Sequence, residues 1–583
     1  MTTPVVNKSH DLTINRAGTL TGWMVVPGSY RRYKANDFTG RVATGPITNS
    51  DLDTWQVSEF KDWTHGIGVE VLEAGGDTQQ YAVGDGNIEA AIPKKLKLAP
   101  RWRVSDASFA ANCYCDAGNY VFAGGASSIR YYDPTADTWA NAVTGLGAAV
   151  VALEVYGGIL YAALGDSVDM QKCIAPSSAP TTWAAVTGKK ARWYKKWKKL
   201  LWMGVGATVV NFDGATTWNT IGLGDITNNA LWGAVQDSAL VVAKSEGLYV
   251  STDGAAFSPI LQDIPEYSGN FAQMRPSQGW LYYNIISSVQ RISALTGSAI
   301  LQIVTPKNIA DDTYGWGIPV SVAASAKYVW VLFNNGGASG NQPWLGLYSG
   351  GNWHPAYLGT AGATAKTCYF SQVAGRLFIN DGSTRARRYL SVNDEGYPDY
   401  DTTAGYAIDF LHLDASLAQI VKAWKEITFV TKNCSANKKI EIYYQADRSG
   451  TWVLAGTVTA SPQQTIALDS TAGAIQAKDL QLRATFYTDS ATVTPEITTI
   501  VVKYLPRPDS IYAVTMVLDI SDYRPLLDGT GNDSQTIAAK LTELRAIADA
   551  KLPVTIDTMD DLEDKAFMTM VSWQDAGILE STQ

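Results

Sequence analysis

A strand pattern that recurs seven times, at intervals of about 40 residues, constrains the fold of this 583-residue chain more than any other feature. Each copy is a short apolar run, such as Tyr120-Val121-Phe122-Ala123. A period of this size predicts four-stranded propeller blades. The centres of the seven runs are Val121, Leu160, Leu201, Val241, Leu281, Val329 and Leu377.

A second strand follows most of these runs, and it often ends in an aromatic residue and then Asp or Gly, as at Phe212-Asp213-Gly214. Asp-Gly and Gly-Gly provide the positive backbone angles of tight hairpins. A bulky aromatic residue then opens the next strand and is expected to fill the wedge between neighbouring sheets. These residues are Trp139, Trp183, Trp218, Phe257 and Trp353. A series of generic hairpins in a sandwich is the alternative, and the regular intervals favour the propeller.

The sequence predicts a mainly β protein in four parts. We expect an N-terminal arm and propeller-closing segment at 1–105, then a seven-bladed β-propeller at 106–400. A β-sandwich of jelly-roll type is expected at 405–506, where several strands alternate apolar and polar residues. A small α+β domain is expected at 510–583, with one helix over Ser534–Ala550.

Two expectations concern the N-terminal part. The aromatic segment Trp55–Gly68 is interpreted as an extended arm packed on the propeller. A propeller must also join its first and last blades, often with a strand from one terminus. Part of residues 85–118 is expected to supply that strand.

Composition excludes several classes of function. The net charge of -9 argues against general nucleic-acid binding, which needs a basic surface. The five cysteines are irregularly spaced and are interpreted as reduced thiols of a protein made in a cytoplasm. Cys113 and Cys115 form a metal half-site that no second pair completes, so we expect no metal or cofactor. Glu154 and Gly157-Gly158 divide the apolar stretch Leu146–Leu164 into two strands, so no membrane segment is expected.

The segment Lys189–Lys199 carries the highest density of charge, because seven of its eleven residues are basic. It has three interpretations: an outer hairpin whose tryptophans face the blade while its lysines are solvated, a contact with an acidic neighbouring subunit, or a site for glycan or nucleic acid. The candidate contact residues are Trp193, Lys195, Lys196, Trp197, Lys198 and Lys199.

The best enzymatic alternative is a glycosidase, since Asn211–Trp218 and Ser251–Phe257 vaguely resemble the Asp-box turns of sialidase propellers. In those folds the box is a structural turn at the blade periphery. Catalysis would also need a suitably spaced pair of carboxylates. The four histidines are far apart in sequence and lack the spacing of a metal or nucleophile motif. We therefore expect no catalytic residues.

The order of parts resembles the minor tail or tail-tip proteins of tailed double-stranded DNA bacteriophages. Three stretches carry the resemblance: Trp63-Thr64-His65-Gly66-Ile67-Gly68 in the arm, a sandwich that opens at Lys425-Glu426-Ile427 and closes at Tyr504–Pro508, and a terminal strand, Leu-rich helix and hairpin. Together they cover most of the chain, although each motif is short.

The resemblance implies a virion structural protein of the tail tip or baseplate, made in the host cytoplasm. It implies roles in tail assembly and host attachment, with other tail proteins, further copies of the chain and host surface glycan as partners. It carries over no catalytic residue. The alternative from another class is a glycan-binding adhesin or glycosidase built on a propeller.

Overall fold

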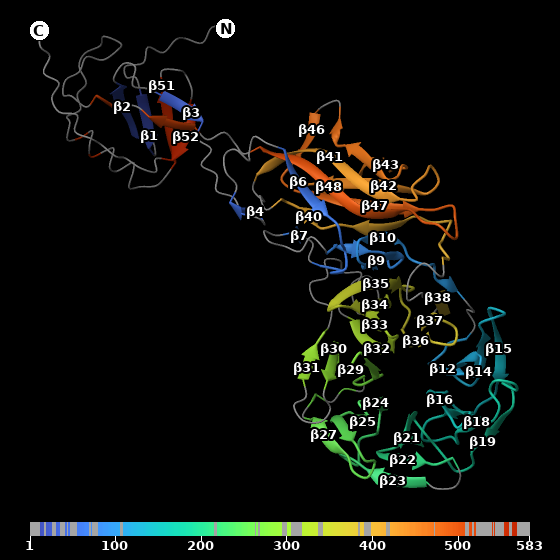
Figure 1. The fold of residues 1–583 in the computed structure, drawn as a ribbon. Coiled ribbons are helices and arrows are strands. Elements are labelled where there is room, and N and C mark those ends of the chain that lie inside the picture. The colour runs from blue at the N-terminus through green and yellow to red at the C-terminus, as the bar shows by residue number, and fades with distance from the viewer. Residues whose placement is uncertain are drawn as a thin grey trace, which may run out of the picture. The chain divides into compact units, whose positions relative to one another are not determined.

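The computed structural model of the chain is mainly β-structure (Figure 1). It describes residues 12–16, 19–25, 31–34, 41–42, 45–46, 55–68, 71–72, 80–104, 109–214, 218–262, 264–265, 267, 269–293, 300–304, 317–335, 342–382, 385–389, 398–415, 420–470, 473–507, 512–515, 518–519, 539, 542, 553–558 and 563–567. The chain divides into two compact units. One comprises residues 1–38 and 509–583, and the other comprises residues 39–508.

Consecutive four-stranded antiparallel sheets occupy the middle of the larger unit and form a β-propeller (Figure 1). The first three sheets contain β12 (Cys113–Ala117), β13 (Tyr120–Gly124), β14 (Ile129–Asp133) and β15 (Thr138–Val143); β16 (Ala152–Tyr156), β17 (Ile159–Ala163), β18 (Gln171–Cys173) and β19 (Trp183–Ala185); and β20 (Trp193–Trp197), β21 (Leu200–Val205), β22 (Thr208–Phe212) and β23 (Trp218–Gly222).

The next four sheets contain β24 (Trp232–Gln236), β25 (Ala239–Lys244), β26 (Gly247–Ser251) and β27 (Ser258–Leu261); β28 (Arg275–Ser277), β29 (Trp280–Ile285), β30 (Ser288–Ser293) and β31 (Ile300–Ile303); β32 (Gly317–Ala324), β33 (Val329–Asn335), β34 (Trp344–Ser349) and β35 (Asn352–Leu358); and β36 (Thr367–Ser371), β37 (Arg376–Asn380), β38 (Arg385–Tyr389) and β11 (Arg103–Val104). The first strands contact one another in chain order, and β36 returns to β12, so the ring is closed.

The aromatic residues of the fourth strands fill the wedges between sheets, as the sequence predicts. Trp139 of β15 lies 5.9 Å from Phe378 of the last sheet, between ring centroids. Trp183 of β19 lies 6.3 Å from Phe122 of the preceding sheet. The indole of Trp353 donates a hydrogen bond to the Val304 carbonyl, 2.7 Å away, in the sheet before its own. Each ring therefore joins its sheet to the one before it.

The strand β11, which precedes the first sheet in sequence, pairs with β38 as the outer strand of the last sheet. It lies inside the 85–118 segment from which a closing strand was expected. Asp399 fixes the strand, because its carboxylate accepts hydrogen bonds from Arg101 Nε at 3.1 Å and Arg103 Nε at 2.6 Å. The indole of Trp102 donates to the Ala356 carbonyl at 2.8 Å.

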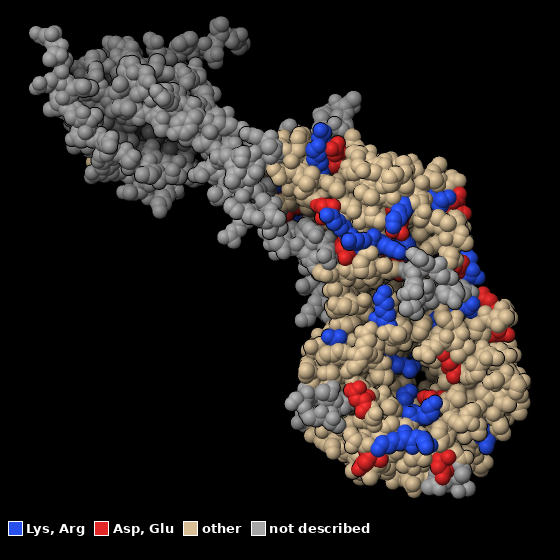
Figure 2. Space-filling view, in the orientation of Figure 1, with Lys and Arg blue, Asp and Glu red and all other residues tan. Residues whose placement is uncertain are grey.

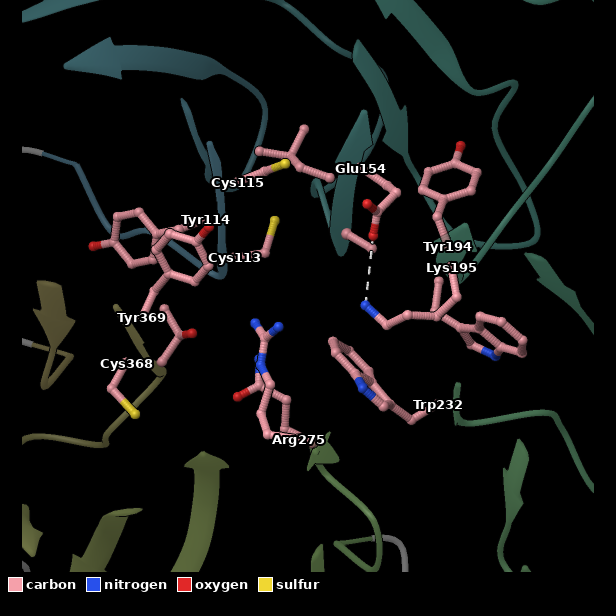
Figure 3. A pocket seen from close by; sticks show the side chains of 15 residues that line it. Cys113, Tyr114, Cys115, Glu154, Tyr194, Lys195, Trp232, Arg275, Cys368 and Tyr369 are labelled. Carbon is pink, nitrogen blue, oxygen red and sulfur yellow. Dashed lines mark ion pairs between the residues drawn. The ribbon is translucent and has the colours of Figure 1, made fainter. Parts of the chain in front are cut away.

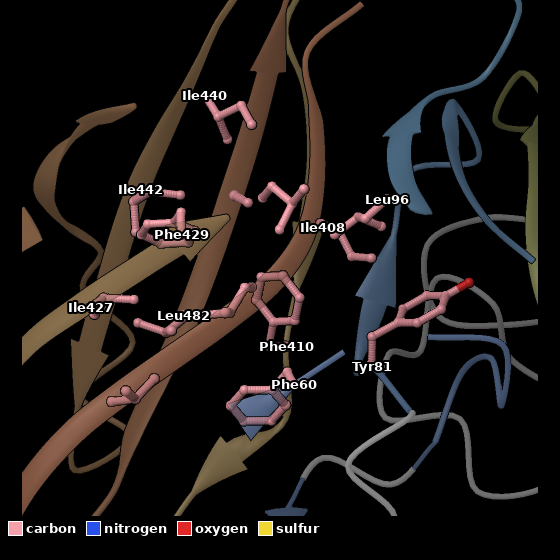
Figure 4. Close-up of a cluster of buried hydrophobic side chains, with 14 of the residues drawn as sticks. Phe60, Tyr81, Leu96, Ile408, Phe410, Ile427, Phe429, Ile440, Ile442 and Leu482 are labelled. Atoms are coloured by element: carbon pink, nitrogen blue, oxygen red, sulfur yellow. The ribbon is translucent and has the colours of Figure 1, made fainter. Parts of the chain in front are cut away.

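Two further sheets in the larger unit share one hydrophobic cluster (Figure 4). The eight-stranded sheet contains β6 (Gln56–Phe60), β9 (Ile88–Ile92), β10 (Lys95–Leu98), β41 (Val421–Lys432), β44 (Gln463–Ala467), β45 (Asp469–Ser470), β46 (Gly473–Ala477) and β48 (Glu496–Arg507). The seven-stranded sheet contains β7 (Val71–Leu72), β8 (Val83–Gly84), β39 (Tyr406–Asp409), β40 (His412–Leu413), β42 (Lys439–Ala446), β43 (Val453–Val458) and β47 (Leu480–Tyr487).

The N-terminal segment does more than the expected arm. β6 and β10 pair with β48, and Phe60 and Trp63 are buried in the cluster, with Trp63 6.2 Å from Phe410. The segment also reaches the propeller, where Ile67 donates its backbone N–H to the Trp353 carbonyl at 2.8 Å. The segment therefore contacts the propeller, and in addition its large apolar rings complete the core of another pair of sheets.

The smaller unit combines both ends of the chain. Its five-stranded sheet has the order β50 (Leu518–Asp519), β2 (Thr19–Val25), β1 (Leu12–Arg16), β51 (Pro553–Thr558) and β52 (Glu563–Phe567). β3 (Arg31–Lys34) pairs with β49 (Tyr512–Thr515). Residues 12–34 thus belong with the C-terminal part rather than with the expected 1–105 segment. The expected helix Ser534–Ala550 lies outside the described residues except Ala539 and Thr542, which are helical.

Candidate functional site: a charged pocket at the centre of the propeller

A pocket of about 130 Å³ lies where the first strands of the propeller sheets converge (Figure 3). Six of these strands contribute side chains to it. Along a strand, successive side chains point to opposite faces, so alternate residues can reach the central channel. Its lining residues are Cys113, Tyr114, Cys115, Ala152, Leu153, Glu154, Trp193, Tyr194, Lys195, Trp232, Gln273, Arg275, Thr367, Cys368 and Tyr369. In the space-filling view, Lys and Arg side chains gather around the central opening of the ring (Figure 2).

An ion pair forms one wall of the pocket. Glu154 of β16 and Lys195 of β20 approach to 3.5 Å, and both side chains are largely buried. Burial lowers the pKa of Lys195 below its ordinary value; Glu154 opposes the shift, and the charge of Arg275 adds to it. The ammonium also lies 5.8 Å from the centre of the Trp232 ring. Lys195 is therefore held by one carboxylate at a long distance in a confined, charged space.

Arg275 enters the pocket opposite this pair (Figure 3). Its Nε donates to the Val322 carbonyl at 3.3 Å, and its guanidinium carbon lies 5.7 Å from the centre of the Tyr369 ring. These contacts fix the base of the guanidinium. No acceptor among the described residues bonds its two terminal nitrogens, which point into the pocket.

Gln273 precedes β28 and is only 7% exposed. Its side-chain oxygen accepts hydrogen bonds from the Ser321 hydroxyl at 2.5 Å and the Val322 backbone N–H at 2.9 Å. Because a backbone N–H can only donate, the acceptor must be the amide oxygen. The amide nitrogen is thus left as a donor to the pocket, and the part of the chain that the structure describes offers it no acceptor.

Three thiols also line the pocket. Burial raises the pKa of Cys113 to about 12 and that of Cys368 to about 11, and it raises the pKa of Cys115 well above its ordinary value. None of the five cysteines is in a disulfide. Thiols with raised pKa values are poor nucleophiles and poor metal ligands. The described residues contain no cluster of His, Cys, Asp and Glu that could hold a metal ion.

The structure divides the candidate contact residues of the basic segment. Trp193 and Trp197 are buried in the core, where their indoles donate to the carbonyls of Ala230 and Ser238. Lys195 faces the central pocket. The other candidates, Lys196, Lys198 and Lys199, are exposed at the end of β20 and in the β20–β21 turn. The two tryptophans therefore cannot contact a partner directly.

The interpretation of Lys189–Lys199 as an outer hairpin is also wrong. β20 is the innermost strand of its sheet, since it contacts the first strands of both neighbouring sheets. Its alternation places tryptophans in the core and Lys195 in the channel. The Asp-box-like turn at 251–257 is, as expected, a structural turn: Asp253 accepts a hydrogen bond from the Ala255 N–H at 2.8 Å, between the outer strands β26 and β27.

The pocket cannot be recognised from any one strand of the sequence, although the repeat as a whole contains a signal for it. Cys115, Glu154, Lys195 and Arg275 each lie six residues before the centre of their repeat. This shared offset marks one position of the repeat that carries ionisable side chains in otherwise apolar surroundings. Neither Glu154 nor Arg275 stands out when its own strand is considered alone.

The described residues include no helix that is long and apolar enough to cross a membrane. No family model matches the chain, and no curated protein matches it. Similar solved structures include a streptogramin B lyase, 13% identical over 58% of this chain and 99% of that chain, with a TM-score of 0.37. The RRP9 WD40 repeats are 12% identical over 51% of this chain and 100% of that chain, also at 0.37. The Myceliophteria thermophila Cps50 (Swd1) β-propeller domain is 11% identical over 49% and 99%, at 0.38. At these identities the similarity concerns the fold alone.

Proposed function

We propose that this chain is a structural protein of a bacteriophage tail tip or baseplate, acting in tail assembly and host attachment. The observation that carries the proposal is the small unit in which both chain ends pair, at β1 with β51 and β3 with β49. A separate terminal unit is suited to anchoring a large body to neighbouring subunits, and the resemblance of the sequence to tail proteins indicates which assembly that is.

We further propose the detailed architecture of the body. The consecutive sheets from β12 to β38, closed by β11, are the blades of one seven-bladed propeller, and the two sheets around the cluster of Figure 4 are a jelly-roll-like β-sandwich. Rigid domains of this kind present broad loop surfaces. We propose that other tail proteins, further copies of the chain and host glycan dock on them.

The proposed role is non-enzymatic. In the central pocket, Glu154 is paired with Lys195, and the thiols are held in their protonated form by burial. The pocket volume of about 130 Å³ is also below the about 300–1,000 Å³ of ordinary substrate pockets. This size gives no support to a glycan-cleaving site at the channel.

Immunogold electron microscopy of purified particles tests the tail-tip role, with antibody raised against the recombinant full chain. Label confined to the distal tail is the expected result. Particles complemented only with a chain lacking residues 1–38 and 509–583 should carry no label, because the anchoring unit is missing. Unlabelled wild-type particles that remain unlabelled after mild denaturation, with the protein free in the lysate, would contradict the proposal.

A further inference from the structure

The central pocket contains more hydrogen-bond donors than the protein satisfies. The two terminal nitrogens of Arg275 and the amide nitrogen of Gln273 have no acceptor among the described residues, while both side chains are fixed at their other atoms by β32. Arg275 is only partly buried, so these donors open onto the channel, where water can satisfy them and a ligand with suitable acceptors can replace that water. Held in this way, the donors are preorganised for an acceptor in the channel.

The side chains that line the pocket carry one more positive than negative charge. Lys195 and Arg275 are cationic, and Glu154 is the one carboxylate in the lining. Burial raises the pKa values of Cys115 and Tyr369, so both remain neutral near pH 7. The lining thus has a net charge of about +1 by this count of ionised groups. One negative charge would neutralise it, whereas a dianion would leave an unpaired charge in a confined space.

The volume of the pocket limits the size of the ligand. The volume of about 130 Å³ is close to the about 150 Å³ of engineered cavities that bind benzene, a molecule of about six heavy atoms. Trp232 and Tyr369 place aromatic surface beside the cations, which suits a ligand with a small apolar part.

We propose that the pocket binds a small monocarboxylate. Arg275 and Gln273 hold the carboxylate, and its negative charge, together with that of Glu154, balances the positive charges of Lys195 and Arg275. A planar carboxylate matches the two parallel N–H groups of a guanidinium. The charges of Glu154 and Lys195 cancel, so the excess positive charge of the pocket is that of Arg275. Gln273 adds a neutral hydrogen-bond donor from a second direction. This proposal is independent of the tail role, because it concerns the isolated chain.

Fluorine NMR of trifluoroacetate with the purified full chain tests the proposal. The signal should broaden saturably, and acetate should reverse the broadening. 2,2,2-Trifluoroethanol has the same apolar group without the charge, so it should not broaden. At about pH 8, above its second pKa, inorganic phosphate is largely dianionic and should compete at least about tenfold more weakly than acetate, because its second charge has no partner in the pocket.

Two variants and one matched control connect binding to the pocket. Gln273→Glu keeps an oxygen for Ser321 and Val322 but replaces the donor by a negative charge, and Arg275→Gln removes the guanidinium. Each should raise the dissociation constant at least about tenfold, since charge-assisted hydrogen bonds are lost. Lys196→Met, one residue from Lys195 but exposed, should bind as the wild type does.

Three results would overturn the proposal. The first is wild-type protein without saturable broadening. The second is unchanged binding by both pocket variants, provided that their unfolding midpoints show them to be folded. The third is phosphate that competes as well as acetate, which would replace the carboxylate by a general oxyanion. Failure of the particle labelling described above would leave this binding assay unaffected.

Discussion

At the scale of single residues, His354 shows how burial determines a protonation state. Its Nδ1 accepts a hydrogen bond from the Tyr81 hydroxyl at 3.1 Å, and its Nε2 donates to the Thr64 carbonyl at 3.2 Å. The carbonyl can only accept, so the proton lies on Nε2. Burial lowers the pKa of His354 to about 4, against an opposing effect of Thr64 and Asp62.

This pKa predicts a loss of stability in mild acid. Between about pH 6.5 and pH 4 the unfolded chain takes up a proton at His354 that the folded chain does not, so the free energy of unfolding falls as pH falls, by about 3 kcal/mol in total. His354→Gln can keep both hydrogen bonds but does not titrate. Urea unfolding of both proteins at pH 7.5, 5.5 and 4.5 should show that, as the pH falls, the wild type loses more stability than the variant. A pH-independent difference would contradict the prediction.

Trp193 illustrates packing at the same scale. Its ring lies against Gly204 and Gly233, and a Cβ on Gly233 would come within 2.3 Å of the ring. We expect Gly233→Ala to destabilise the protein by about 1–3 kcal/mol through overpacking, measured by urea unfolding. Gly222→Ala is the matched control, since its Cβ would meet nothing within 4 Å. Equal stability of the two variants would show that the ring moves aside at little cost.

At the scale of elements, the propeller strands were the most predictable part of the chain. Strands buried on both faces read as continuous apolar runs, and wedge residues such as Trp139 and Trp353 recur at fixed places after them. The closing strand β11 could only be assigned to a broad segment, because two residues carry no period. The pairing of β6 and β10 with β48 was not predictable, since local sequence does not specify a partner more than 390 residues away in the chain.

The closing strand leads to a prediction of its own. Asp399 binds Arg101 and Arg103, so Asp399→Ala should loosen β11 and lower the free energy of unfolding by about 2 kcal/mol. Cleavage by trypsin after Arg103, followed over time by mass spectrometry, should become faster. Asp489→Ala removes an exposed ion pair with Lys438 and should change stability by less than about 1 kcal/mol. Unchanged cleavage in Asp399→Ala would show that β11 is held by backbone pairing alone.

The candidate site was predictable only in part, for a related reason. Sequence reasoning singled out the basic segment and included Lys195, but Glu154 and Arg275 come from other sheets. Their meeting follows from closure of the ring, which brings the same position of each repeat to one axis. High local charge density in the sequence points instead to exposed lysines such as Lys196.

At the scale of the whole molecule, the division into two units predicts independent folding. A chain of residues 39–508 should unfold in urea at the midpoint of the corresponding transition of the full chain, because its internal contacts are complete. Removing only residues 1–38 should leave residues 509–583 sensitive to protease, since β51 loses β1 and β49 loses β3. The test is limited proteolysis with mass spectrometry. Full protection of the C-terminal part without residues 1–38 would show that it folds without the N-terminal strands.

The pairing of the two chain ends also sets an order of events during synthesis. β1 and β3 are translated before the body of residues 39–508, whereas β51 and β49 are translated after it. Domains generally fold in the order in which they are translated. The body therefore has time to fold before the terminal sheet can be completed, and a chain truncated anywhere in the body never forms that sheet. A completed terminal sheet thus indicates that all residues between its N-terminal and C-terminal strands have been translated.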